Sequence, residues 1–212
     1  MQIVCLVFDG VTALDAVGPY EVLSRLPGAT FTFVGPGPGT VRTDNGVLGL
    51  VVDGSIDDAP AADVLVVPGG IGTRRLVDDD RVVDWVRATH ATTMWTTSVC
   101  TGSLVLGAAG ILEGLDATTH WTELESLAGF GARPVASRVV ERGKIITAAG
   151  VSAGIDMALV LAARIGGEFV AQAIQLGIEY DPQPPYDAGS PDKAPREAVE
   201  LVRTLMATAT NA

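Results

Sequence analysis

The strongest constraint on the fold is a series of short runs rich in apolar and β-branched residues. The first covers residues 3–8, and four similar runs, rich in Val, Ile, Thr and aromatic residues, follow at 30–34, 64–67, 94–99 and 145–147. A run without polar alternation is typical of a strand buried on both faces, as in a parallel sheet. Patterns typical of helices occur at 80–90, 104–109, 121–127, 155–165 and 196–206. Strands that alternate with helices predict an α/β fold.

Two stretches predict small antiparallel additions to this sheet. Residues 35–54 are glycine-rich with short alternating pieces, and residues 134–147 contain a turn sequence at 141–144 between two apolar runs. Residues 180–195 hold five prolines and predict an irregular loop before the last helix. Because the chain contains no internal repeat and no Pro/Ser-rich linker, we expect one domain over residues 1–212.

Charge and composition exclude several classes of function. The 212 residues include 14 basic and 25 acidic side chains, a net charge of −11, whereas nucleic-acid binding needs clustered Lys and Arg. We therefore expect no nucleic-acid partner. The longest apolar runs, such as residues 157–163, are shorter than the roughly 18 residues that span a membrane. Without a GxGxxG or GxxxxGK motif, we also expect no nucleotide cofactor.

The two cysteines indicate a reducing compartment. Cys5 and Cys100 lie far apart, and without a CxxC pair they predict neither a disulfide framework nor a zinc site. The first residues enter an apolar run without the basic region of a signal peptide, and Asp9 interrupts that run early. We therefore expect a cytoplasmic protein without a bound metal or a membrane anchor.

Cys100 has the sequence surroundings of a nucleophile. It ends an apolar run, a helical pattern begins just after it, and small residues stand at 98, 101, 102 and 103. This arrangement is typical of a nucleophile elbow, a tight strand-to-helix turn at the carboxyl end of a sheet. We expect an exposed thiol whose pKa is lowered from about 8.5 by helix amides. A buried structural cysteine is the alternative, and it is the preferred interpretation for Cys5, which lies within a strand.

Four further residues are candidates for the same site. Gly69 and Gly70 follow the run at 64–67, and their amides are placed either to bind a developing anion or to form an ordinary turn. Asp15 is a lone carboxylate in an apolar stretch, where it could instead cap a helix over residues 19–26. His120 follows a short strand and is a candidate accessory residue, with a structural hydrogen bond as the alternative.

Together these segments resemble the PfpI-like superfamily, flavodoxin-like α/β proteins related to class I glutamine amidotransferases. The resemblance runs nearly end to end. It is carried by SVCTGS at 98–103, LVLGAAG at 104–110, ATTHW at 117–121, AGID at 153–156, AGSPD at 188–192 and an LDxxGP motif at 14–19. Within the superfamily, these motifs are similar to the branch that contains isocyanide hydratases and the ligand-sensing halves of certain AraC-type transcription regulators.

The resemblance implies a mainly parallel central sheet flanked by helices, a homodimer and an enzyme that uses no cofactor. It implies that Cys100 is the nucleophile, that Asp15 is its partner and that Thr101 contributes to the site. The expected reaction begins when Cys100 adds to an isocyanide carbon while Asp15 delivers a proton, which gives a thioimidate. Water then releases an N-substituted formamide, and amides near Gly69, Gly70 and Thr101 steady the developing charge.

Two departures from the superfamily motifs narrow the range of expected functions. The PfpI protease branch has His directly after the nucleophile, whereas Thr101 stands here, so peptidase activity is not expected. The regulators carry a helix-turn-helix region after this domain, whereas this sequence ends at Ala212 after one predicted helix, so we expect a stand-alone enzyme.

Two other functions fit a reactive cysteine in this fold. One is a non-catalytic small-molecule or redox sensor, in which Cys100 is ligated or oxidised. The other is a glyoxalase-like enzyme of the same superfamily, which also uses a Cys and an acidic residue. Catalytic turnover distinguishes a sensor from an enzyme, and the choice between an isocyanide and methylglyoxal distinguishes the two enzymes.

Overall fold

A seven-stranded sheet forms the centre of the fold in a computed structural model that describes residues 1–210. The strand order is β10-β11-β7-β6-β1-β2-β5, and only β10 runs antiparallel to its neighbour. The strands are β1 (Gln2–Leu6), β2 (Thr30–Gly35), β5 (Gly54–Ser55), β6 (Val64–Val67), β7 (Trp95–Val99), β10 (Val139–Arg142) and β11 (Ile145–Ala148). The five strands predicted from apolar runs take the flavodoxin order, which confirms the expected fold class.

Burial explains why the apolar runs form the centre of the sheet. All four residues of β6 are buried, and so are Ile3 to Leu6 of β1. The turn predicted at 141–144 joins β10 to β11, with Gly143 at a φ of 60°. The glycine-rich stretch forms the antiparallel pair β3 (Gly39–Arg42) and β4 (Gly49–Val52), as expected. A second small pair, β8 (Asp116–Ala117) and β9 (Arg133–Pro134), is parallel and was not expected.

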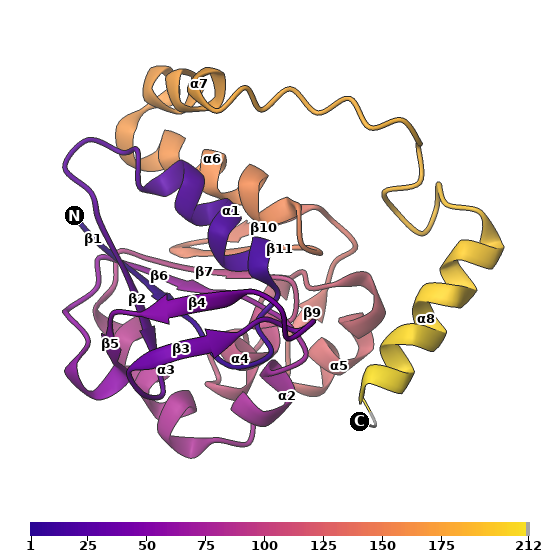
Figure 1. The fold of residues 1–212 in the computed structure, drawn as a ribbon, viewed down its shortest axis with the longest axis horizontal. Coiled ribbons are helices and arrows are strands. Elements are labelled where there is room, and N and C mark those ends of the chain that lie inside the picture. Colours follow the sequence, from indigo (N-terminus) through magenta and orange to yellow (C-terminus); the bar gives the residue numbers. More distant parts are fainter. Residues whose placement is uncertain (211–212) are drawn as a thin grey trace. The chain divides into compact units, whose positions relative to one another are not determined.

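Helices cover both faces of the sheet (Figure 1). One face carries α1 and α6, with α7 packed on α6, and the other carries the helices α2 to α5. The helices are α1 (Ala13–Leu23), α2 (Thr73–Leu76), α3 (Asp80–Thr92), α4 (Gly102–Ala108), α5 (Leu124–Gly129), α6 (Ala153–Gly166) and α7 (Glu168–Gly177), with short 3-10 turns at η1 (Ile56–Asp58) and η2 (Trp121–Glu123). No helix within residues 1–210 is long and apolar enough to cross a membrane.

Three helix expectations need correction. The helix expected at 19–26 begins at Ala13, so Pro19 lies inside it. The pattern at 121–127 is divided between η2 and α5, and α7 was not predicted. Helices α1 and α6 approach closely at Pro19: a Cβ on Gly154 of α6 would lie 3.4 Å from the Pro19 ring.

The chain divides into two compact units, Met1–Ile178 and the residues from Glu179 onward. The first unit contains the sheet and its covering helices. The second is irregular up to α8 (Arg196–Thr210), as the proline-rich sequence predicted. The expectation of one domain over residues 1–212 stays a prediction, and residues 211–212 lie outside the described chain.

Candidate active site

The carboxyl ends of three neighbouring parallel strands bring the predicted site residues together. Cys100 directly follows β7, Gly69 and Gly70 follow β6, and Asp15 lies in the first turn of α1, the helix after β1. Because β1, β6 and β7 are adjacent in the sheet, their following turns meet at one edge. Segments that are far apart in the sequence therefore form a single site.

Cys100 occupies the tight strand-to-helix turn that the sequence predicted. Its φ of 54° lies in the left-handed region, which is unfavourable for a residue with a side chain. Its backbone N–H donates to the carbonyl of Ala149 at 2.9 Å, and its carbonyl accepts hydrogen bonds from Thr119 Oγ1 at 2.9 Å and Ser103 Oγ at 3.1 Å. These partners hold the strained backbone in place.

Glycine at 102 allows α4 to pack directly on the neighbouring strand. A Cβ there would lie 2.0 Å from the carbonyl oxygen of Val67, at the end of β6. Any larger residue would push α4, and with it the turn that carries Cys100, away from the sheet. The small residue in the motif therefore has a steric cause.

The thiol of Cys100 is buried rather than exposed, which corrects the expectation from the sequence. Only 6% of the residue is accessible. Burial, and next the negative charge of Asp15, raise the pKa of the Cys100 thiol above its ordinary value. Contacts from the Thr101 and Val151 backbone amides and from the Thr101 hydroxyl act in the opposite direction. The expected lowering is absent because these amides do not compensate for the loss of water around the sulfur.

Asp15 faces this sulfur and is fully buried. Its Oδ2 accepts a hydrogen bond from the Gly69 amide at 3.0 Å, whereas its buried Oδ1 has no N–H or O–H donor among the described residues. Burial raises the pKa of Asp15 from 3.8 to about 7, although hydrogen bonds from Gly69 and from the Cys100 thiol lower it in part. Asp15 lies beside the Cys100 sulfur and is not the cap of a helix: Thr12 precedes the first turn of α1.

The two glycine amides that were expected to remain open for an anion are instead paired with protein groups. The Gly69 amide donates to Asp15, and the Gly70 amide donates to Thr101 Oγ1 at 2.9 Å. Thr73 Oγ1 also donates to Thr101 Oγ1, at 3.1 Å. A Cβ on Gly69 would lie 2.6 Å from the Thr101 nitrogen and 2.9 Å from Asp15 Oδ2, so this position requires glycine. The glycines hold Asp15 and Thr101 in place.

The two histidines have different surroundings. His90 lies on α3, away from Cys100 in the sequence, and its Nδ1 hydrogen-bonds to Thr96 Oγ1 at 2.9 Å. His120 lies closer to the site: a Cβ on Gly150, the residue before Val151, would be 2.7 Å from its Cδ2 atom. Burial lowers the pKa of His120, so its ring is neutral at pH 7.

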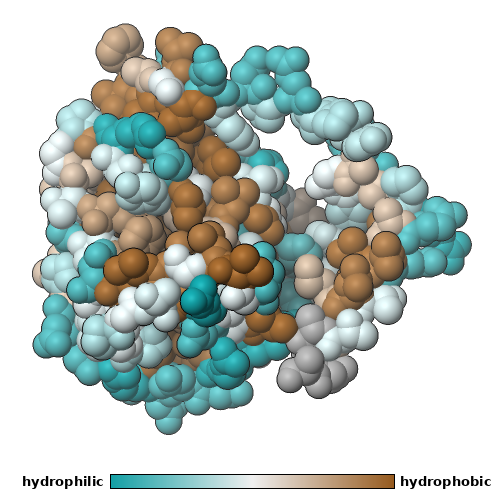
Figure 2. All heavy atoms as spheres, in the orientation of Figure 1, coloured by the Kyte–Doolittle hydropathy of each residue, from teal (hydrophilic) through white to brown (hydrophobic). Residues whose placement is uncertain are grey.

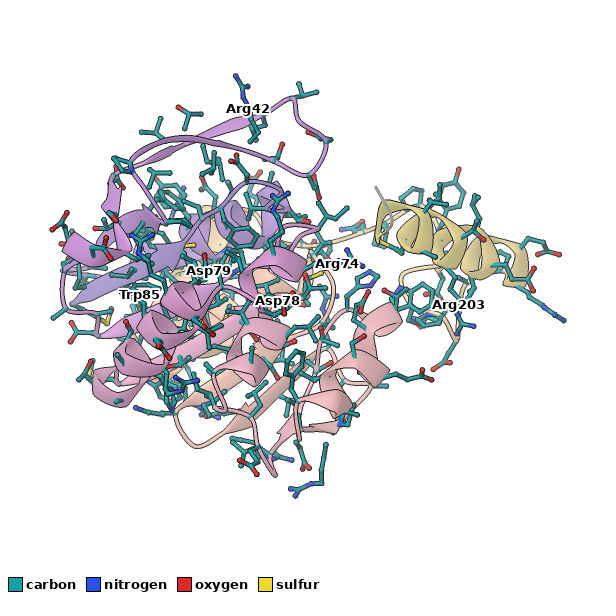
Figure 3. The ribbon with its side chains drawn as sticks, turned by 90° about the horizontal axis from the view of Figure 1, so that it is seen from below. Arg42, Arg74, Asp78, Asp79, Trp85 and Arg203 are labelled. Carbon is teal, nitrogen blue, oxygen red and sulfur yellow. The ribbon has the colours of Figure 1, made fainter. Side chains whose placement is uncertain are left out.

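An ion pair crosses the surface next to His120. Arg74, labelled in Figure 3, extends from α2 to Glu123 of η2, with 3.1 Å between Nη2 and Oε1. Glu123 follows His120 by three residues, and its charge partly offsets the effect of burial on the His120 pKa. Among the residues that the structure describes, no group of three His, Cys, Asp or Glu side chains is arranged to hold a metal ion.

Val151 is the site residue that the sequence did not predict. It precedes α6, has a φ of 29°, and directs its amide at the Cys100 sulfur. A β-branched residue at positive φ has no sequence signature, because β-branched residues ordinarily avoid this region. Cys5 is fully buried in β1, which agrees with the structural role expected for it.

A buried cysteine on a tight turn beside a buried carboxyl, at the carboxyl edge of a flavodoxin-like sheet, defines a class of cysteine-centred α/β proteins. The DJ-1/PfpI family model matches residues 1–164, and the chain belongs to this family. The chain is 45% identical over 203 residues to a protein named isonitrile hydratase from Pseudomonas putida. The aligned residues cover 96% of this chain and 89% of the relative.

Two other comparisons found similar proteins. The crystal structure of a THiJ/PfpI family protein from Pseudomonas syringae superposes with a TM-score of 0.95 and 40% identity, over 99% of this chain and 87% of that one. The transcriptional regulator GbdR from Pseudomonas aeruginosa is 33% identical over 130 residues, which is 60% of this chain and 35% of the regulator.

Proposed function

We propose that this protein hydrates an isocyanide, also called an isonitrile, to an N-substituted formamide, with Cys100 as nucleophile and Asp15 as the group that moves protons. The observation that carries the proposal is the buried Asp15 carboxyl, which interacts with the Cys100 thiol and has a pKa of about 7. The identity to a protein named isonitrile hydratase supports the choice of substrate class.

In the reactive form of the site, Cys100 and Asp15 together hold one proton. Because burial raises both pKa values and that of Cys100 more strongly, the proton resides on sulfur and Asp15 is the carboxylate at pH above about 7. As sulfur attacks the isocyanide carbon, Asp15 accepts the thiol proton and then transfers it to that carbon. The product of this step is a thioimidate, R–N=CH–S–Cys100, and Asp15 is a carboxylate again.

Water completes the reaction. Asp15 removes a proton from a water molecule that attacks the thioimidate carbon, and it returns this proton to the nitrogen. The resulting tetrahedral species breaks its carbon–sulfur bond, its hydroxyl proton passes through Asp15 to sulfur, and the formamide R–NH–CHO leaves. The sum is one isocyanide plus one water, with Cys100 and Asp15 regenerated. A carboxyl with a pKa near 7 suits both the accepting and the donating steps.

The surrounding groups have supporting roles in this proposal. The Thr101 and Val151 amides contact sulfur, so they stabilise negative charge on it during attack and when the carbon–sulfur bond breaks. Oδ1 of Asp15, which lacks an N–H or O–H donor, is the oxygen available to the reacting water. His120 lies behind Gly150 and has an accessory role, which consists of supporting the segment that carries Val151.

A steady-state comparison of substrates tests the proposal. The reduced protein is given several alkyl and aryl isocyanides and, separately, methylglyoxal, and the products are identified by chromatography and mass spectrometry. We expect N-substituted formamides at many turnovers per Cys100 and no lactate. Lactate from methylglyoxal would favour a glyoxalase-like enzyme. Loss of one thiol per chain without turnover would favour a sensor, the kind of role that the similarity to a transcriptional regulator points to.

We further propose that the protein is a homodimer in the cytoplasm. Apolar side chains gather over α1, α6 and the β3–β4 pair (Figure 2), and exposed members include Leu14, Val47 and Val51. An apolar surface of this kind is typical of a protein interface. Both cysteines are free, as expected in a reducing compartment. Sedimentation at micromolar concentration should give twice the 21.8 kDa chain mass, and a monomer would contradict the dimer.

A further inference from the structure

Two ion pairs connect α6 to β10 and to the residue just before β10, one at each end of the helix. Arg138, just before β10, pairs with Asp156 in the first turn of α6, and its Nη2 donates to Ser152 Oγ at 3.3 Å. At the other end, Arg164 pairs with Glu141 of β10 at 3.0 Å. The two arginine side chains are similarly exposed, 50% and 55%, so they form a natural pair for comparison.

Only the Arg138 pair lies next to the nucleophile. The Ala149 N–H donates to the Arg138 carbonyl at 2.9 Å, and the Ala149 carbonyl accepts from the Cys100 N–H, also at 2.9 Å. Arg138 therefore holds the chain before Val151 with its backbone and the chain after Val151, through Ser152, with its guanidinium. Its planar fork contacts Ser152 and Asp156 together, which a lysine ammonium does not reproduce.

The segment between these two anchors is strained. Val151 has a φ of 29°, which is costly for a β-branched residue and persists only where the surrounding contacts enforce it. In this conformation its amide contacts the Cys100 sulfur. If an anchor were lost, Val151 would relax toward an ordinary conformation and its N–H would turn away from the sulfur.

We infer that Arg138 is a positioning residue for Cys100: its carbonyl and guanidinium hold residues 149 and 152 so that the strained Val151 amide stays against the sulfur. The inference rests on the proposed function in that it treats Cys100 as the nucleophile. Its chemical consequence is that Arg138, which is not assigned any contact with substrate, controls how readily the thiolate forms. Loss of the Arg138 side chain does not change the charge of Asp15 on α1, which is the charge that acts on the sulfur.

The test compares Arg138→Ala with Arg164→Ala in the full-length protein. Alkylation of Cys100 by iodoacetamide is followed by mass spectrometry from pH 6 to pH 10, together with steady-state turnover of an isocyanide. Without the Val151 hydrogen bond, the pKa of the thiol should rise by about one unit, which lowers the thiolate fraction about tenfold at each pH. Because a more basic thiolate is also more nucleophilic, Arg138→Ala should be alkylated at least about threefold more slowly. Its kcat should fall with KM unchanged. Arg164→Ala should stay within about twofold of wild type.

Several outcomes overturn the inference. Alkylation of Arg138→Ala at the wild-type rate would show that Arg138 does not position the amide. Equal slowing in Arg164→Ala would show that both pairs merely dock α6. If Arg138→Ala does not fold, Asp156→Asn removes the same ion pair with little change in size, and it should show the same slowing or the inference fails. If wild type turns over no isocyanide but the alkylation difference is present, the proposed function fails and the positioning role stands.

Discussion

Replacing Asp15 by Asn should make the protein more stable while it removes activity. Asn has nearly the size of Asp and keeps an oxygen that accepts from the Gly69 amide, but it is never charged. In the folded protein the pKa of Asp15 is raised from 3.8 to about 7. A carboxyl whose folded pKa is raised destabilises the fold: the cost is fully present above the folded pKa and decreases as the pH falls toward the unfolded value.

The magnitude follows from the size of this shift. About three pKa units at ~1.36 kcal/mol each give a cost of about 4 kcal/mol above pH 7. At pH 5 the folded carboxyl is protonated, and the same linkage leaves a cost of about 2 kcal/mol. The advantage of Asp15→Asn over wild type should therefore grow by about 2 kcal/mol between pH 5 and pH 8.

Urea unfolding at pH 5 and at pH 8 measures this difference, provided that both proteins unfold in one step with the same m-value. Asp116→Asn is the matched control, because Arg142 and Arg133 lower the pKa of Asp116. Its stabilising ion pairs are fully present above the unfolded pKa of 3.8, so the stability difference between wild type and Asp116→Asn should be the same at pH 5 and at pH 8. A stability difference for Asp15→Asn that is independent of pH, or a variant less stable than wild type at pH 8, would refute the reasoning.

Three other predictions follow from the site. Cys100→Ser should fold normally and lose turnover in a steady-state isocyanide assay, because a hydroxyl is a far weaker nucleophile than a thiolate. The control Cys5→Ser should keep most of its turnover. A rate for Cys100→Ser within about tenfold of wild type, which corresponds to ~1.4 kcal/mol of barrier, would contradict this prediction. Because Asp15 must be the carboxylate to accept the thiol proton, kcat/KM should fall about tenfold per pH unit below pH 7 and level off above it, and a profile that decreases with rising pH would be inconsistent. Gly69→Ala should have lower activity and a lower melting temperature than wild type, since its Cβ would lie 2.9 Å from Asp15 Oδ2. The control Gly177→Ala, with no atom within 4 Å of its Cβ, should change neither quantity. An active Gly69→Ala would show that the close approach is unimportant.

The sheet was the most predictable part of the fold. Runs rich in apolar and β-branched residues predicted five of its six parallel strands, because strands covered on both faces are rich in such residues. Helix α1 was harder to place, since Pro19 looks like a helix start, yet it lies inside the helix where α1 and α6 pack closely. Helix α7 was harder to predict because no Ser, Thr, Asp or Asn marks its start: Gly167 precedes it without a side-chain cap.

The site was predictable where a residue follows a strand and unpredictable where distant segments define its surroundings. The turn at Cys100 and the position of Gly69 follow from local sequence. The burial of the thiol does not, because Asp15 and Val151 cover it from elements that are remote in the sequence. The sequence predicted a lowered pKa for the Cys100 thiol, which was wrong for this reason: the local helix amides were visible in the sequence, but the loss of water around the sulfur was not.

The central claim is that the protein adds water to the isocyanide carbon by repeated turnover at Cys100. The most direct measurement incubates reduced protein with an isocyanide in ¹⁸O-labelled deuterated water, without added metal or nucleotide, and determines the mass of the product. We expect an N-formamide that carries ¹⁸O and a solvent-derived deuterium on its formyl carbon, at many turnovers per Cys100. An unlabelled product, or consumption of no more than one equivalent of isocyanide per Cys100, would contradict it.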